Sequence, residues 1–159
     1  NEGTPFQGIL YAGLMLTETG PQVIEFNCRF GDPETQVILP AWNGNIIDTM
    51  LACTQGTLST ASMPEDADRC AVCVVLAAEG YPGSYKKQLK LKTVPDGSDH
   101  VTFHAGTVSV KREWVSSGGR VLNAVGFGTD LASARTRAYD VADQLCVPGL
   151  FYRRDIAQI

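Results

Sequence analysis

The amino-terminal residues alternate between apolar and polar positions in a way that predicts two paired strands. Residues 8–17 are almost entirely apolar, and residues 18–21 have the glycine and proline of a turn. Over residues 22–30 apolar side chains recur at every second position, and Glu25 and Asn27 lie on the opposite face. This pattern is typical of a half-buried strand in an antiparallel hairpin.

Two short helices are expected after the hairpin. Asp32 can cap a helix, Pro33 suits the first helical position, and Glu34 suits the first turn. We therefore expect one helix over residues 33–41 and a second over residues 45–51.

A polar stretch over residues 55–69 then interrupts the pattern, and it predicts a domain boundary. We expect the part of the chain after this boundary to be rich in β-structure with one packing helix. Its expected strands span residues 70–78, 88–94, 101–110 and 121–127, and its expected helix spans residues 131–145 after a capping Asp130.

Composition narrows the possible classes of function. With 44% hydrophobic residues the chain can form a globular core, and its longest apolar run, residues 71–78, is far shorter than the roughly 20 residues of a membrane span. A net charge of −4 without a cluster of basic residues argues against nucleic acid or a membrane as partner. Five cysteines without a spaced framework or a signal sequence favour a cytoplasmic protein. The chain begins at Asn1 rather than Met, which suggests a piece of a longer protein.

The strongest local signal for a binding site is the Glu25-Phe26-Asn27 motif. Residues two apart on a strand point the same way, about 6.5–7 Å apart, so a carboxylate and an amide oxygen share one face. Such oxygens suit a hard cation that also binds substrate phosphates, and Arg29, on the same face, could bind an anion. A solvated strand face explains the same residues. Residues 29–34 likewise suit either an anion site at a helix start or an ordinary capped helix.

Several motifs together resemble one known family. The run VIEFNCRFGDPETQ at residues 23–36 resembles the signature of the phosphoribosylamine–glycine ligase (glycinamide ribonucleotide synthetase) family, which belongs to the ATP-grasp superfamily. Further motifs resemble the same family in the same order, so the likeness covers essentially the whole chain. These motifs are GILYAGLM at 8–15, GYPG at 80–83, FHAGT at 103–107, SGGRVL at 117–122 and FYRRD at 151–155.

The resemblance implies an α+β fold and an ATP-dependent carbon–nitrogen ligase. Residues 1–62 would be the C-terminal part of an ATP-grasp domain, with antiparallel strands plus helices, and residues 65–159 the small C-terminal domain. The family joins glycine to 5-phosphoribosylamine in purine biosynthesis, using ATP and Mg²⁺ or Mn²⁺, through glycyl phosphate. The family's N-terminal half, which holds the ATP phosphates, would be missing here, so this piece alone is expected to be inactive and to need that half as its partner.

The resemblance also implies roles for individual residues. Glu25 and Asn27 match the family's metal ligands, and Arg29 matches a catalytic position at the phosphoryl-transfer end. Many ATP-grasp enzymes place a further acidic ligand on the preceding strand, but residues 8–17 contain no acid.

The resemblance also implies substrate contacts for three more residues. Met15 falls where related enzymes place an apolar contact to adenine, and Asp32 and Glu34 would lie near the amine or the acyl phosphate.

Two other functions stay open: another ATP-grasp carboxylate–amine ligase, and a non-catalytic packing module. Among the remaining candidates, Cys70 and Cys73 face opposite sides of a strand and are interpreted as core residues. His104 is interpreted as structural. Residues 116–120 could form either an anion-binding turn or a tight connection, and the arginine pair at 153–154 either a solvated end or part of a cleft.

Overall fold

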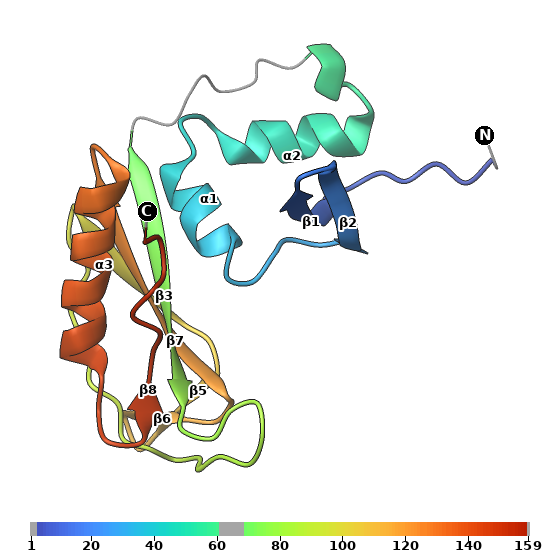
Figure 1. Ribbon diagram of the computed structural model, residues 1–159. Helices are drawn as coiled ribbons and strands as arrows, with labels where there is room; N and C mark the ends of the chain where they lie inside the picture. The colour runs from blue at the N-terminus through green and yellow to red at the C-terminus, as the bar shows by residue number, and fades with distance from the viewer. Residues whose placement is uncertain (1–2, 61–68, 159) are drawn as a thin grey trace.

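The computed structural model describes residues 3–60 and 69–158, and its amino-terminal part is a hairpin followed by helices (Figure 1). The expected hairpin and both expected helices are present, although the second helix ends at Gln55 instead of residue 51. Asn45 caps that helix by accepting a hydrogen bond from the Ile47 backbone N–H. The elements are β1 (Tyr11–Thr17), β2 (Gly20–Asn27), α1 (Thr35–Ala41), α2 (Ile46–Gln55) and the short 3₁₀ helix η1 (Leu58–Thr60).

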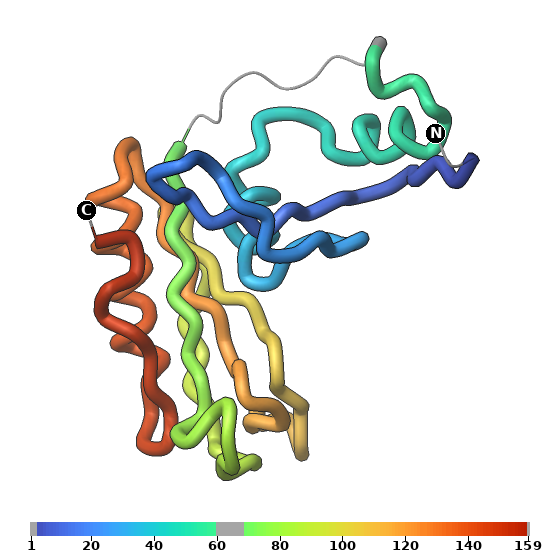
Figure 2. The backbone as a smooth tube through the Cα atoms, turned by 45° about the vertical axis from the view of Figure 1, so that its right-hand side comes forward, coloured from blue at the N-terminus to red at the C-terminus, as the bar shows by residue number. Residues whose placement is uncertain are grey.

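The carboxyl-terminal part is a twisted antiparallel sheet with the strand order β4-β7-β3-β8, to which a second small hairpin, β5-β6, is attached. Helix α3 covers one face of this sheet, and α1 lies on the other side of β3 (Figures 1 and 2). The expected boundary between residues 62 and 65 falls outside the described residues. The elements are β3 (Cys70–Ala78), β4 (His100–His104), β5 (Thr107–Val110), β6 (Glu113–Ser116), β7 (Arg120–Gly128), α3 (Leu131–Leu145) and β8 (Leu150–Phe151).

The hydrophobic core lies between this sheet and α3. Leu76 and Leu122, which pair across β3 and β7, are almost completely buried against the apolar stripe of the helix. Gly126 allows this close approach, because a Cβ atom there would lie only 2.2 Å from the Ala138 backbone nitrogen. The expected cap is confirmed: the Asp130 carboxylate accepts a hydrogen bond from the Ser133 N–H at 2.7 Å, within a capping box.

The expectation of a half-buried strand in the first hairpin is wrong. Ile24 and Phe26 are 63% and 60% exposed, and β2 is exposed on both faces along most of its length. A β-bulge also interrupts the alternation, because Glu25 pairs with Gly13 while Val23 pairs with Leu14, which leaves Ile24 as the extra residue. The described residues thus leave the apolar positions of this hairpin without a covering layer.

Two expected strands of the second part also differ. Residues 88–94 form only one isolated bridge, Lys90 to Val115, because Gln88 has a left-handed backbone (φ 61°) that breaks the extended pattern. Residues 101–110 are two strands instead of one, since the chain turns at Gly106 to contact the β6–β7 connection. Strands β6 and β8, each four residues or fewer, were too short to be expected.

The core can be tested with a pair of matched truncations. Replacing the fully buried Leu76 with Ala removes core contacts and leaves a cavity, so we expect the free energy of unfolding to fall by about 2–5 kcal/mol. The measurement is urea unfolding of the 159-residue chain. The control is Leu16→Ala, because Leu16 is 82% exposed and its truncation should change stability by less than about 0.5 kcal/mol. Equal effects of the two substitutions would contradict this assignment of the core.

Candidate functional site

Glu25 and Asn27 project side by side from β2. The Asn27 side-chain Nδ2 donates a hydrogen bond to Glu25 Oε1 at 2.8 Å, and the Glu25 side chain is exposed to solvent. The alternation of a strand places both on one face, as their spacing predicted. The structure therefore brings together the two side chains expected to hold a cation.

The same face of the hairpin carries Met15. Gly13 pairs with Glu25, and a Cβ atom at Gly13 would lie 3.2 Å from Glu25 Cγ, so the carboxylate side chain lies across this glycine. Met15 follows Gly13 by two positions on β1 and therefore projects from the face that carries Glu25. It is 55% exposed. The predicted adenine contact and the predicted metal ligands thus share one open surface.

Arg29 lies beyond the strand. Because β2 ends at Asn27, the strand periodicity used to place Arg29 on the same face does not extend to it. Its guanidinium Nη1 donates instead to the Phe30 carbonyl at 2.8 Å, and the side chain is exposed. Arg29 thereby begins a tight segment, residues 29–34, that we call the corner.

Asp32 joins the corner to the carboxyl-terminal sheet. Arg120, at the start of β7, pairs with Asp32 Oδ2 at 2.9 Å and donates to its carbonyl oxygen at 2.8 Å. The Gln36 side-chain Nε2 donates to the other carboxylate oxygen at 3.1 Å. The expected capping role of Asp32 is therefore wrong. Its carboxylate accepts hydrogen bonds from these two side chains, and α1 begins later, at Thr35 rather than residue 33.

Glu34 is the second carboxylate of the corner. Its Oε1 accepts a hydrogen bond from the Tyr11 hydroxyl at 3.0 Å, and this bond to a carboxylate raises the pKa of Tyr11. Gly31 lies directly beneath it, and a Cβ atom there would lie 2.3 Å from Glu34 Oε2. Glu34 therefore lies between β1 and the corner, half-buried.

The donor set at Glu25 and Asn27 suits a hard divalent cation. A carboxylate and an amide provide oxygen ligands, and the exposed face leaves the remaining coordination positions to phosphate or water. The amide of Asn27, which is only partly buried, would turn its oxygen toward the ion. Within residues 3–60 and 69–158, no group of three or more His, Cys, Asp or Glu side chains could hold a metal, so a cation here would depend on substrate oxygens.

Two cavities border the corner. One, of about 370 Å³, lies between Pro33 and the sheet and includes Cys73, Tyr81 and Arg120 in its lining. Burial raises the pKa of the Cys73 thiol to about 12, so this cysteine is a poor nucleophile at neutral pH. The other, of about 400 Å³, lies between α1 and the end of β4.

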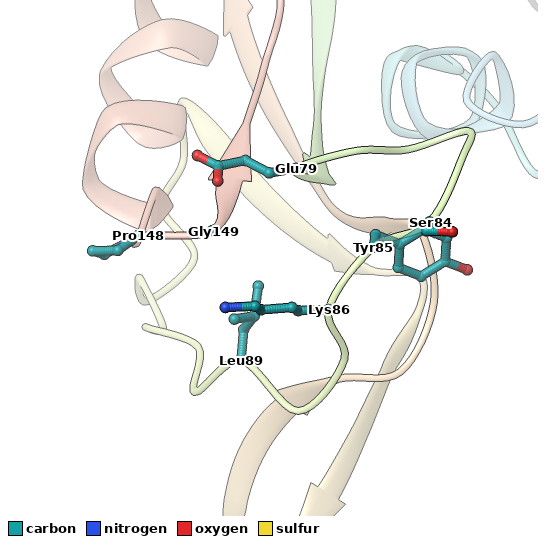
Figure 3. Close-up of a pocket in the computed structure, with 7 residues that line it drawn as sticks. All are labelled: Glu79, Ser84, Tyr85, Lys86, Leu89, Pro148 and Gly149. Atoms are coloured by element: carbon teal, nitrogen blue, oxygen red, sulfur yellow. The ribbon is translucent and has the colours of Figure 1, made fainter.

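A third cavity, of about 620 Å³, lies away from the corner (Figure 3). It is formed by the loop after β3 and the turn before β8, with Glu79 and Lys86 among its lining residues (Figure 3). None of the predicted site residues lines it.

Structural contacts account for the two cysteines of β3 and for the glycine-rich connection at residues 116–120. Cys70 packs against the core under α3, whereas Cys73 lines the cavity on the opposite face, so the two thiols diverge as expected. The N–H groups of Ser117 and Gly118 both donate to the Gly106 carbonyl, which favours the tight connection over an anion-binding turn.

The two arginines near the end of the chain are each paired with a carboxylate. Arg153 pairs with Asp155, and Arg154 pairs with Asp143 at 3.1 Å. Arg153 also lines the cavity beside Pro33.

Sequence similarity identifies the family to which this arrangement belongs. Residues 71–159 match the family model described as phosphoribosylglycinamide synthetase, C domain, and residues 1–35 match that of its ATP-grasp (A) domain. The chain belongs to the phosphoribosylglycinamide synthetase family. The mixed fold expected from the sequence, part of an ATP-grasp domain followed by this C domain, is therefore confirmed.

Individual members of the phosphoribosylglycinamide synthetase family match almost the whole chain. Phosphoribosylamine–glycine ligase of Caulobacter vibrioides is 45% identical over 98% of this chain and 37% of its own length. The trifunctional purine biosynthetic protein adenosine-3 of Gallus gallus is 43% identical over 98% of this chain and 16% of its own length. The crystal structure of phosphoribosylamine–glycine ligase from Thermotoga maritima has a TM-score of 0.77 and 38% identity, covering 92% of this chain and 36% of that one.

The chain thus spans about 37% of the length of the curated ligases that it matches. In the part of the chain that the structure describes, no helix is both long and apolar enough to cross a bilayer.

Three residues that touch the predicted site were not assigned a role from the sequence. Tyr11 and Gln36 contact the two carboxylates of the corner, and Arg120 reaches it from a position 88 residues beyond Asp32. The SGGRVL motif was the available signal for Arg120, but it gives no indication of the partner.

The link between Arg120 and Asp32 can be tested by hydrogen exchange. Arg120→Met removes both contacts to Asp32, so we expect the amides of Thr35 and Gln36, which bond within the adjoining turn, to exchange faster. The increase should reach at most about fivefold, because an exposed ion pair contributes no more than about 1 kcal/mol. Arg112→Met, at an exposed arginine in the β5–β6 turn, is the matched control. Unchanged exchange in Arg120→Met would show that the corner is held by other contacts.

Proposed function

We propose that this chain is the catalytic carboxyl-terminal portion of an ATP-dependent phosphoribosylamine–glycine ligase. The observation that carries the proposal is the Glu25–Asn27 pair, with side chains 2.8 Å apart on an open face, in a chain of this family. The names of its relatives supply the two substrates, the amine and glycine. The ATP-grasp model that residues 1–35 match supports ATP as the third.

The proposed reaction has two steps. A glycine carboxylate oxygen attacks the γ-phosphorus of ATP, which forms glycyl phosphate and releases ADP. The nitrogen of 5-phosphoribosylamine then attacks the glycyl carbonyl carbon, loses a proton, and displaces inorganic phosphate with the bonding electron pair. Both steps depend mainly on positioning and on stabilisation of developing charge, which suits a site without an activated nucleophile.

Residues of the hairpin and of the corner contribute to different parts of this reaction. Arg29 stabilises the charge that develops on the transferred phosphoryl group, and Met15 contacts the adenine. Glu34 and Asp32 act where the amine meets the acyl phosphate, Glu34 through its carboxylate and Asp32 by fixing the corner.

Glu25 and Asn27 would hold Mg²⁺ or Mn²⁺ on the face of the hairpin. When bound, such a cation neutralises charge on the ATP phosphates. Glu25 is exposed and Asn27 is partly exposed, which supports this assignment, since the nucleotide can approach the face that carries them.

The metal assignment is tested by Glu25→Gln in the complete enzyme. This substitution keeps the size of the side chain and removes its charge, so we expect kcat to fall by about 10²–10³-fold, as when one group that stabilises developing charge is lost. The measurement is formation of ADP with glycine and phosphoribosylamine at saturating Mg²⁺. Glu18→Gln, in the exposed turn of the same hairpin, is the control and should leave kcat unchanged. Turnover of Glu25→Gln within a few-fold of the parent would make the metal assignment wrong.

The 159-residue chain by itself is expected to have no ligase turnover. It matches the ATP-grasp model over residues 1–35 only and spans about 37% of the length of its relatives. The measurement is ADP formation by the chain alone and after mixing with the preceding portion of the Caulobacter vibrioides ligase. Activity that appears only in the mixture is the expected result, and normal rates from the chain alone would contradict it.

A further inference from the structure

Tyr11 lies where the hairpin meets the corner. It is the first residue of β1 and pairs with Asn27, the last residue of β2. It precedes Gly13 by two positions, so its side chain projects from the face that carries the Glu25 carboxylate. The side chain is half-buried, and its hydroxyl reaches Glu34 in the corner. One residue therefore contacts both segments to which the proposed reaction is assigned.

The hydrogen bond between Tyr11 and Glu34 has only one possible direction. An ionised carboxylate has no proton to give, so the phenol O–H donates and Glu34 Oε1 accepts, at 3.0 Å. A hydrogen bond to a charged acceptor is stronger than one between neutral groups, and the partial burial of this one limits competition from water. A glutamate side chain has several rotatable bonds, so without this contact it would occupy more than one orientation. Tyr11 thus fixes the direction of the carboxylate.

The other oxygen of Glu34 stays available. No described residue donates a hydrogen bond to Oε2, and this atom is not among the buried polar atoms that lack a partner, so solvent can reach it. It lies over Gly31, where the absence of a side chain leaves room for it. Because Tyr11 holds one oxygen of the carboxylate, it also determines where the free oxygen lies.

Tyr11 also relates this carboxylate to the predicted metal ligands. It lies directly opposite Asn27 across the hairpin, so the Glu34 carboxylate is held against the strand that carries the Glu25–Asn27 pair. In the proposed reaction the acyl phosphate forms beside the cation and must then meet the amine. A displacement of about 1 Å between reacting groups can lower a rate by about 10²-fold, so the placement of this carboxylate matters for the second step.

We propose that Tyr11 is a positioning residue for the attack of the amine: its hydroxyl holds Glu34 Oε1, so that Oε2 accepts a hydrogen bond from the nitrogen of 5-phosphoribosylamine. This inference rests on the proposed ligase function for the identity of the amine. It adds to that function a residue that acts on the second step through Glu34 and not on the first.

The test is steady-state kinetics of Tyr11→Phe in the complete enzyme. The substitution removes the hydroxyl and keeps the ring, so the hairpin should keep its structure. We expect kcat/KM for phosphoribosylamine to fall about tenfold, whereas KM for ATP and KM for glycine stay within about twofold of the parent values. The matched control is Tyr85→Phe, which removes the same group beside the third cavity, away from the corner, and should leave all three values unchanged (Figure 3).

A double variant separates positioning from a structural role. Glu34→Ala removes the group through which Tyr11 is proposed to act, and it should lower the same kcat/KM by at least about tenfold. Adding Tyr11→Phe to Glu34→Ala should then cause less than about twofold further loss, because the two substitutions remove one shared contact. A further tenfold loss in that background would show that Tyr11 acts independently of Glu34, and it would overturn the proposal.

The remaining outcomes are also decisive. An unchanged kcat/KM for the amine in either single variant overturns the proposal, and so does a parallel rise of KM for ATP and for glycine in Tyr11→Phe, which would indicate a general disturbance of the hairpin. If the parent enzyme forms ligated product and Tyr11→Phe forms it equally well, only this inference fails. If the parent enzyme forms no ligated product, the proposed function fails, and the role of Tyr11 in it fails as well.

Discussion

The contact between Arg120 and Asp32 joins the two halves of the molecule next to the predicted site. One guanidinium holds both a carboxylate oxygen and a backbone oxygen of the same residue, and the planar fork of arginine fixes the direction of both bonds. The two side chains are 41% and 45% exposed, so the pair adds little to the free energy of unfolding. Its effect is geometric. It orients the corner against β7, while the packing of α1 on β3 supplies the apolar contact between the same two parts.

This contact matters because the residues proposed to carry the chemistry lie in the less buried part of the chain. The sheet and α3 form a close-packed core, in which Leu76, Leu122 and Leu145 are almost completely buried. The hairpin that carries Glu25 and Asn27 has only two strands and is exposed along most of its length, an arrangement that is marginally stable in isolation. Attachment at the corner lets the rigid sheet position residues that the hairpin could not hold precisely in place by itself.

The sequence predicted those features that depend on neighbours close along the chain. The alternation around Glu25 placed its carboxylate beside Asn27, and the apolar spacing with Asp130 in front predicted α3 correctly. Prediction failed where a distant partner decides the local structure. Asp32 has the sequence context of a helix cap, but Arg120 and Gln36 occupy its carboxylate. Similarly, no local pattern reveals the left-handed backbone of Gln88 or the contact that divides residues 101–110 into two strands.

The sequence predicted the same kind of substrate contact for Asp32 and Glu34, but the hydrogen bonds of the two carboxylates differ. Each oxygen of Asp32 already has a protein donor, which holds this carboxylate in place. In Glu34 only Oε1 has a donor, the Tyr11 hydroxyl, and no described residue donates to Oε2. An ionised carboxylate with a free oxygen can accept an N–H group from an incoming amine, whereas one paired with arginine on one side and an amide on the other serves to hold its backbone in place. This geometry agrees with the roles proposed above, in which Glu34 faces the substrate and Asp32 holds the corner in place.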